Sequence, residues 1–386
     1  MRPSLDIELT PPFDDARAPA RPGVVVFEGE GGSCVLVAAT GDVRAFVGAR
    51  LGAGADGRGA RADLRPVTTR VRAATVGSAL EGDLVCLEVA RERLPATYRA
   101  LADRCPAWFI HLDPGEPAPT WRKINLLGVG EELPAGALLG PIPDKHAAAR
   151  FGEALDDLFE LCRYPRELAR APRGTACAYK EMGRCPAACD GSEPMDAYRA
   201  RVRAAIACWR DGTRVTRDAI ERDMREAAGA HDFERAAALK ARMGGLDVAT
   251  KPRFANVGVL DDLALVLALP GERAGWARLV VFAGGELTAV ADVEGDVRAG
   301  RAWDEIERAV LDAGACGGGF AHSGAAAERL GVICSHWFRR AVKGRRRRPG
   351  FVDLRRAWDA RAVRRAIRAA ATPGEADEFR ETEVAG

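Results

Sequence analysis

Short apolar runs separated by glycine-rich breaks fill the first part of the chain. Residues 24–27 (VVVF) and 34–38 (CVLVA) have the composition of strands and are joined by a Gly-Glu-Gly-Gly turn. Apolar positions recur at helical spacing over residues 42–51 and 84–101, and residues 108–112 (WFIHL) form a further strand-like run. This order of elements predicts a small domain of mixed α and β structure.

Helical periodicity dominates the middle of the chain. Residues 147–162 repeat apolar side chains every three or four positions, which predicts an amphipathic helix. A proline-broken, cysteine-bearing loop follows to about residue 190. Residues 194–211 and 217–243 then carry two further helical patterns.

From residue 254 the pattern returns to strands. The strand-like runs are residues 257–260, 263–269 and 279–282. Gly284-Gly285 is a hairpin turn signal. Residues 303–313 have helical spacing, and a basic helical pattern over residues 352–371 precedes an acidic tail.

A chain of 386 residues exceeds what one hydrophobic core usually supports, so more than one domain is expected. The patterns predict an α+β multidomain protein. Its expected parts are a disordered N-terminus (1–22), a small α/β domain (23–125), a helical cysteine-bearing domain (140–212), a helical hairpin (213–248), a β-rich α/β domain (253–342), and a basic helix with an acidic tail (343–386).

Composition and charge indicate the cellular location of the protein more clearly than its activity. The formal net charge is only +2, so the chain as a whole is not a general polyanion binder. The N-terminus is polar and acidic, unlike a signal peptide, and no apolar stretch is long enough to span a membrane. We therefore expect a cytoplasmic protein in which the ten cysteines are reduced.

Four cysteines stand out by their spacing. Cys162, Cys177, Cys185 and Cys189 are separated by fourteen, seven and three residues. Four thiolates complete the coordination of zinc or of an iron–sulfur cluster, and the lack of paired Cys-x₂-Cys knuckles favours a cluster. The alternative is that they are small buried apolar residues, which is the usual state of a free cysteine.

A second motif, HDFERAAALKARM, occupies residues 231–243. The residues at helical spacing on one face are Phe233, Ala236, Ala237, Lys240, and Met243 or Gly244. This face is apolar and mostly small, so another helix could approach it closely. A helix packed in the core of its own domain fits the periodicity equally well.

These motifs together resemble the bacterial excision-repair protein UvrC. The pieces that match its cysteine region are Gly140-Pro141, residues 159–162, Cys177, Gly183-Arg184-Cys185 and Cys189. In that family the four cysteines hold a 4Fe–4S cluster, so the resemblance implies this cofactor, with Zn²⁺ as the alternative. One departure is local: Pro186 follows the third cysteine, whereas the family tends to place a proline just before the fourth.

The second motif is similar to the UVR motif, a helical hairpin shared by UvrC and UvrB. The matching residues are Met224, Ala227, Ala228, Phe233, Glu234, Ala236, Ala237 and Leu239. In the family this hairpin binds the corresponding hairpin of UvrB, so the resemblance implies UvrB or a UvrB-like helicase as a partner. Lys240 and Ala241 replace the family's Arg-Asp pair in the expected interface, which removes one polar contact.

The N-terminal domain corresponds to the GIY-YIG nuclease of UvrC, which uses a Tyr, an Arg and a metal-binding Glu. The aligned residues 22–25 (PGVV) and 35–40 (VLVAAT) lack both tyrosines, the glycine and the lysine of the family. Phe46 occupies the Arg position, with Arg44 two residues earlier, and Glu88 is the candidate metal ligand. We therefore expect a degenerate GIY-YIG domain that no longer cuts DNA. The alternative is a nuclease in which Glu88 holds a divalent metal and Arg44 replaces the lost Arg.

The last part of the chain is densely basic. Its longest run is Arg345, Arg346, Arg347 and Arg348, with Trp337 and Trp358 on either side. Arginine clusters contact phosphates and an indole can stack on an exposed base, so we expect DNA binding here. The alternative is a solvated helix face that the acidic tail partly neutralises. We expect no counterpart of the RNase H-like nuclease and helix-hairpin-helix domains of UvrC.

The resemblance therefore predicts a UvrC-like, nucleoid-associated component of nucleotide excision repair. It would bind UvrB and double-stranded or damaged DNA without cutting it, as a partner or regulator. The alternatives are an active, metal-dependent, structure-specific endonuclease of the GIY-YIG type, and an iron–sulfur or zinc protein unrelated to UvrB.

Overall fold

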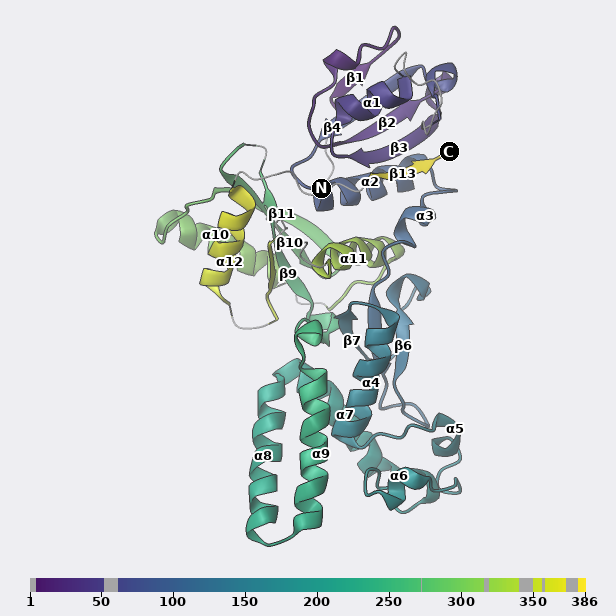
Figure 1. Ribbon diagram of the computed structural model, residues 1–386, viewed down its shortest axis with the longest axis vertical. Helices are drawn as coiled ribbons and strands as arrows, with labels where there is room; N and C mark the ends of the chain where they lie inside the picture. The colour runs from purple at the N-terminus through teal and green to yellow at the C-terminus, as the bar shows by residue number, and fades with distance from the viewer. Residues whose placement is uncertain are drawn as a thin grey trace. The chain divides into compact units, whose positions relative to one another are not determined.

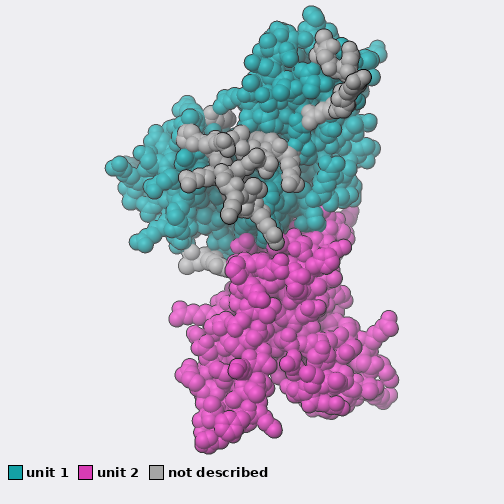
Figure 2. Space-filling model, in the orientation of Figure 1, with its two compact units in different colours: residues 1–106, 264–317, 325–386 teal, residues 107–263, 318–324 magenta. Residues whose placement is uncertain are grey.

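The computed structural model describes most of the chain and divides it into two units. The described residues are 5–51, 62–271, 273–315, 319–339, 350–355, 358–372 and 381–386. Unit 1 comprises residues 1–106, 264–317 and 325–386, and unit 2 comprises residues 107–263 and 318–324 (Figure 2). Both contain helices and small sheets, as the sequence predicts for an α+β protein.

Unit 1 contains a five-stranded antiparallel sheet built mostly from the first 75 residues. Its strand order is β1 (Ile7–Leu9), β4 (Arg70–Thr75), β2 (Gly23–Glu28), β3 (Cys34–Thr40) and β13 (Thr382–Ala385) (Figure 1). β2 and β3 form the hairpin that the two apolar runs predict. Every residue of β2 is buried, so both faces of the sheet are covered.

Two helices cover the faces of this sheet, α1 (Val43–Leu51) and α2 (Ala79–Arg93). Adjacent residues of a strand point to opposite faces. In β13, Thr382 donates a hydrogen bond to Asp83 of α2 (Oγ1 to Oδ1, 3.0 Å), whereas Glu383 pairs with Arg50 of α1. The two helices therefore lie on opposite faces.

Both ends of the chain are more ordered than the sequence predicts. Residues 7–9, within the segment expected to be disordered, pair with β4. Residues 382–385, within the expected acidic tail, pair antiparallel with β3. Each of these strands forms its hydrogen bonds with a partner that is distant in sequence, so no local sequence pattern predicts the strand.

A second antiparallel sheet in unit 1 has the strand order β11 (Glu286–Glu294), β10 (Trp276–Ala283), β9 (Ala264–Pro270) and β12 (Gly350–Asp353). Gly284 and Gly285, both with positive φ, form the predicted β10–β11 turn. One face is covered by the helices α10 (Arg301–Gly314) and α12 (Ala360–Ala371). The helix predicted over residues 352–371 is therefore shorter, because residues 350–353 pair with β9.

Unit 2 combines a third sheet with a layer of long helices. The strand order is β6 (Arg122–Asn125), β5 (Trp108–Leu112), β7 (Ala137–Ile142) and β8 (Gly258–Val259). The long helices are α4 (Lys145–Phe159), α7 (Met195–Asp211), α8 (Thr213–Gly229) and α9 (Phe233–Ala249). One hydrophobic core joins the strands to these helices. β5 and β6, which the sequence assigns to the first domain, therefore belong with the helical region.

Shorter elements complete the two units. The remaining α-helices are α3 (Arg99–Ala102), α5 (Pro165–Leu168), α6 (Ala178–Glu181) and α11 (Gly324–Trp337). The 3-10 turns are Asp15–Arg17, Glu30–Gly32, Arg65–Val67, Leu126–Gly128, Ala188–Asp190, Pro252–Phe254 and Leu260–Asp262. Within the described ranges, no helix has the length and apolar character that crossing a bilayer requires.

Candidate functional site

The four predicted ligand cysteines lie on one loop-rich segment of unit 2. Cys162 follows the end of α4, where Glu160 takes a left-handed conformation (φ 54°) that turns the chain. Cys177 is the N-cap residue of the short helix α6. Cys185 lies in the loop that follows, and Cys189 lies in a 3-10 turn.

The four thiols are close enough to influence one another electrostatically. Burial raises the pKa of Cys162 to about 11, with smaller contributions in the same direction from the other three thiols. Burial also raises the pKa of Cys185, and a backbone hydrogen bond at Ala187 acts in the opposite direction. The Cys162 thiol is therefore protonated at neutral pH unless a bound cation stabilises its thiolate.

A buried tyrosine fixes the first of these cysteines. The hydroxyl of Tyr198, on α7, accepts a hydrogen bond from the backbone N–H of Cys162 (3.2 Å) and donates one to the carbonyl of Pro119 (2.9 Å). Tyr198 is fully buried, so these two bonds satisfy a hydroxyl that water cannot reach. The side chain thus joins the cysteine segment to α7 and to the loop before β6.

The chemistry of the four thiols suits a metal, but their placement falls short of a closed site. Soft sulfur donors are those that zinc and iron–sulfur clusters prefer. Among the residues that the structure describes, no group of three or more His, Cys, Asp or Glu side chains is arranged to hold one ion. The four predicted ligands are thus gathered in one region without ligating geometry.

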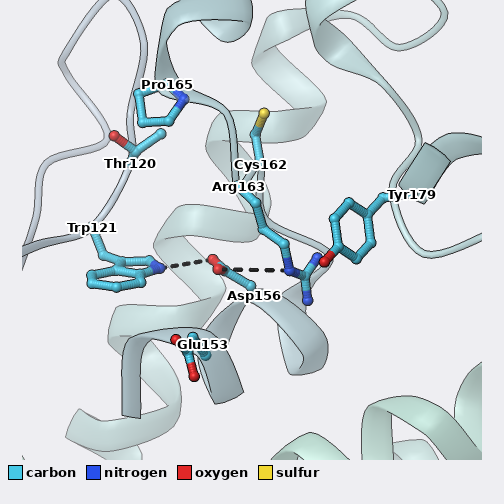
Figure 3. Close-up of a pocket in the computed structure, with 8 residues that line it drawn as sticks. All are labelled: Thr120, Trp121, Glu153, Asp156, Cys162, Arg163, Pro165 and Tyr179. Carbon is cyan, nitrogen blue, oxygen red and sulfur yellow. Dashed lines mark hydrogen bonds and ion pairs between the residues drawn. The ribbon is translucent and has the colours of Figure 1, made fainter. Parts of the chain in front are cut away.

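A cavity of about 420 Å³ adjoins Cys162 (Figure 3). It is lined by Thr120, Trp121, Glu153, Asp156, Cys162, Arg163, Pro165 and Tyr179. Asp156 is almost fully buried and accepts a hydrogen bond from the Trp121 indole N–H (Nε1 to Oδ1, 2.8 Å). Burial raises the pKa of Asp156 to about 7, although Trp121 and Arg163 act in the opposite direction.

Arg163 forms the other side of the cavity. Its Nε lies 4.0 Å from Oδ2 of Asp156, and its Nη2 donates to Asp157 (2.6 Å). The guanidinium lies over the Tyr179 ring, 4.2 Å from the centroid. Its Nη1 atom is buried and has no hydrogen-bond partner in the described part of the chain.

The region with the second motif folds as a helical hairpin of α8 and α9. Residues 230–232 connect the two helices, and His231 in this turn has positive φ (57°). The apolar periodicity runs unbroken over residues 217–243, and the structure divides it at this turn into the two helices of the hairpin expected over residues 213–248. Arg242 donates from Nε to the Leu158 carbonyl (3.0 Å), and Gly245 lies against the α4 backbone with no room for a side chain. The hairpin is therefore anchored to α4 through the second half of α9.

The predicted partner-binding residues divide between the two sides of α9. The residues that pack inward are Met224, Ala236 and Leu239. The residues with exposed side chains are Phe233, Glu234, Ala237 and Lys240. Phe233 is 68% exposed, which is unusual for a large apolar residue on an ordered helix. Two of the outward residues, Phe233 and Ala237, form a small exposed apolar stripe near the turn of the hairpin, beside the charged Glu234 and Lys240.

The structure does not bring together the two candidate nuclease residues. Arg44, on α1, donates hydrogen bonds to the carbonyls of Ala18 (2.8 Å) and Ala16 (3.2 Å). Glu88, on α2 and therefore across the sheet, accepts from Arg329 of α11 (3.2 Å). Both groups already have partners in the fold.

The predicted DNA-binding residues Arg345, Arg346, Arg347 and Arg348 lie outside the described residues. The sequence also gives no sign of Asp156 and Tyr198 as functional residues. Asp156 stands beside Asp157 in a helical pattern, where a solvated acidic pair is the ordinary interpretation. Its burial depends on Trp121, which lies 35 positions away.

Comparison with known proteins places the strongest similarity in this region. A family model described as the UvrC/Cho excinuclease middle domain matches residues 109–208. The UvrABC system protein C of Natronomonas pharaonis is 26% identical over 60% of this chain and 38% of its own length. The proteins of the same name from Thermus thermophilus and Halobacterium salinarum are each 33% identical, over 34% and 38% of this chain and 21% and 26% of their own lengths.

The chain thus spans about a fifth to two fifths of the length of these curated relatives. No solved structure matches it. The family match covers α4, the four cysteines and most of α7, which are the elements around the cavity. The chain is therefore a UvrC-like protein, and its residues 109–208 match the model of the UvrC/Cho excinuclease middle domain.

Proposed function

We propose that this chain is a component of nucleotide excision repair that binds DNA and a UvrB-like helicase and does not itself cut DNA. The observation that carries the proposal is the exposed apolar stripe on α9, next to a UvrC-type middle domain. An ordered helix that keeps Phe233 in water loses burial energy, and a partner protein would recover it. On this proposal the chain assists or regulates incision by other subunits.

The engaged state of the candidate nuclease residues supports the non-catalytic part of the proposal. A GIY-YIG nuclease needs its Arg and Glu to face the same phosphate. Here Arg44 and Glu88 lie on opposite faces of a sheet and are bonded to other groups. The positions of the two family tyrosines hold Val25 and Leu36, which supply no hydroxyl to orient water.

The cofactor proposed for Cys162, Cys177, Cys185 and Cys189 is a 4Fe–4S cluster, with Zn²⁺ as the alternative. The four-thiol donor set, gathered on one segment in which the thiols influence one another electrostatically, supports this assignment. The group would cross-link the loop to α4, and binding would require the loop to move its sulfurs closer together. Anaerobic purification followed by iron, sulfide and zinc analysis distinguishes the two metals from a metal-free protein.

Binding to UvrB tests the main proposal. We expect Phe233→Ala to weaken capture by UvrB about tenfold or more, since a buried aromatic anchor is a typical interface hot spot. Leu311→Ala is the matched control, because Leu311 is also an exposed apolar residue (41%) but lies on α10. Neither change should alter thermal stability. Equal capture by both variants and the unchanged protein would contradict the proposed interface.

A cleavage assay tests the non-catalytic part of the proposal. We expect no incision of a labelled nicked or lesion-bearing duplex in the presence of Mg²⁺ or Mn²⁺. Cleavage that Glu88→Gln abolishes would show an active nuclease and would overturn this part of the proposal.

The proposed DNA contact is tested separately. Replacing the four arginines at 345–348 with alanine should reduce the slope of log K against log salt by about 3 to 4, since each phosphate contact contributes about 0.9. An unchanged slope would show that the arginines do not contact DNA.

A further inference from the structure

We propose that the cavity beside Cys162 binds a nucleobase, either from a DNA strand or from a free nucleotide. The inference rests on the proposed function in so far as DNA is the expected source of that base. It goes beyond that function by naming a site for one base in the middle domain. Figure 3 shows the residues that would receive it.

The cavity has the size and walls that a flat ring requires. Its volume of about 420 Å³ lies within the usual range for small-molecule sites and exceeds that of a single base. Trp121 and Tyr179 line it from two different segments. A side chain at Gly152 would collide with the Trp121 ring, so the indole lies directly on α4. This packing holds the ring in place as a fixed wall.

The polar groups of the cavity match the edge of a base. Trp121 uses one oxygen of Asp156, which leaves the other oxygen near Arg163. A buried carboxyl group that is partly protonated near neutral pH can both donate and accept a hydrogen bond, as can the amide edge of a base. Enzymes that read an extruded base use the same combination of aromatic walls and edge hydrogen bonds.

The charges of the cavity favour a neutral ligand over an ion. Asp156 and Glu153 oppose the charge of Arg163, and Asp157 also pairs with that guanidinium. A free phosphate would be repelled by the carboxylates, and a metal cation would have to displace Arg163 from its carboxylate partners. An uncharged planar ring that carries hydrogen-bonding groups meets neither penalty.

The test uses 2-aminopurine, a fluorescent base whose emission is quenched when it stacks on an aromatic ring. The full chain is titrated with a duplex that carries 2-aminopurine in a single-stranded gap, with the same base fully paired, and with the 2-aminopurine mononucleotide. We expect quenching with the gapped duplex and not with the paired one. Quenching by the mononucleotide alone would assign the site to a free nucleotide, whereas no quenching with any probe would overturn the proposal.

Three variants make the result specific. Trp121→Ala should weaken binding of the gapped probe about tenfold, the usual effect of losing one stacking ring. Asp156→Asn keeps an acceptor for Trp121 and should change the preference among the four bases at the gap. Trp276→Ala, in unit 1, is the control and should leave both properties unchanged. Unchanged binding in Trp121→Ala, together with an unchanged base preference in Asp156→Asn, would overturn the proposal. If Trp121→Ala does not fold, an unchanged base preference in Asp156→Asn would overturn it alone.

The two proposals can fail independently. If Phe233→Ala leaves UvrB capture unchanged but Trp121→Ala weakens the gapped probe, only the proposed partner is wrong. If UvrB capture depends on Phe233 but 2-aminopurine is not quenched, only the base site is wrong.

Discussion

The N-terminal sheet region and the middle domain treat their candidate functional residues in opposite ways. In the sheet region the two candidate nuclease residues, Arg44 and Glu88, have hydrogen-bond partners within the fold. In the middle region the four thiols raise one another's pKa but, among the described residues, are not arranged to hold an ion. Buried polar groups are costly unless they are bonded. The first set is thus already bonded to other parts of the fold, whereas the second set lies together without a bonded partner such as a metal.

The largest expected effect concerns the cysteines. Cys162→Ser together with Cys185→Ser should abolish metal binding and remove stabilisation on the order of 10 kcal/mol of apparent binding free energy. Cys34→Ser, a half-buried cysteine in the sheet region, should retain the metal in full. Metal analysis and chemical denaturation measure both effects. If the variant with both Cys162→Ser and Cys185→Ser keeps its metal, the two regions do not differ in metal binding as proposed.

Metal affinity should also depend on pH. Because burial raises the pKa of Cys162 to about 11, binding must release a proton from this thiol. The affinity should therefore rise between pH 6 and pH 8, as measured by competition with a chelator. A flat profile would show that the thiols are not ligands.

The next effect separates the two sides of the hairpin. Leu239→Ala should lower the free energy of unfolding by about 3 kcal/mol, because Leu239 is buried between the hairpin helices and the core. Phe233→Ala should change it by less than about 0.5 kcal/mol, because its side chain is mostly in water. Urea denaturation of both variants measures the difference. A large loss with Phe233→Ala would mean that the exposed stripe is structural.

Asp156→Asn should stabilise the protein at alkaline pH. The folded state raises the pKa of this carboxyl from an ordinary value near 3.8 to about 7, so the folded protein binds this proton more tightly than the unfolded chain. This group therefore lowers stability as pH rises from about 4 to about 7. Asparagine cannot ionise and should add up to about 4 kcal/mol at pH 8 and less than half of that at pH 5, since about 1.36 kcal/mol corresponds to one pKa unit. Denaturation at the two pH values tests this, and an equal effect at both would contradict it.

The smallest effect tests the structural role of Glu88. Glu88→Gln should lower the free energy of unfolding by about 1 kcal/mol, because Glu88 and Arg329 are both largely shielded from water. Glu305→Gln, in an exposed pair with Arg301, should have almost no effect. Thermal denaturation compares the two. If Glu88→Gln leaves the stability unchanged, the ion pair between Glu88 and Arg329 does not stabilise the fold.

The sequence predicts the long helices of the middle region well, because the apolar spacing of α4 and α7 repeats over several turns. The helical hairpin expected over residues 213–248 is present, but periodicity alone does not place its turn at residues 230–232, since the alanines on both sides continue the helical pattern. The cysteines are recognisable from their type and spacing alone. The cavity is not recognisable, because Trp121, Asp156 and Tyr179 meet only in three dimensions.

The strand Thr382–Ala385 has a consequence for synthesis on the ribosome. Arg50 and Glu383, which join α1 to this strand, are 333 positions apart in the chain. Until residues 382–385 are translated, the outer edge of β3 has unpaired N–H and C=O groups, and such edges recruit other strands. A ribosome that stalls before these residues would therefore leave a sheet prone to aggregation.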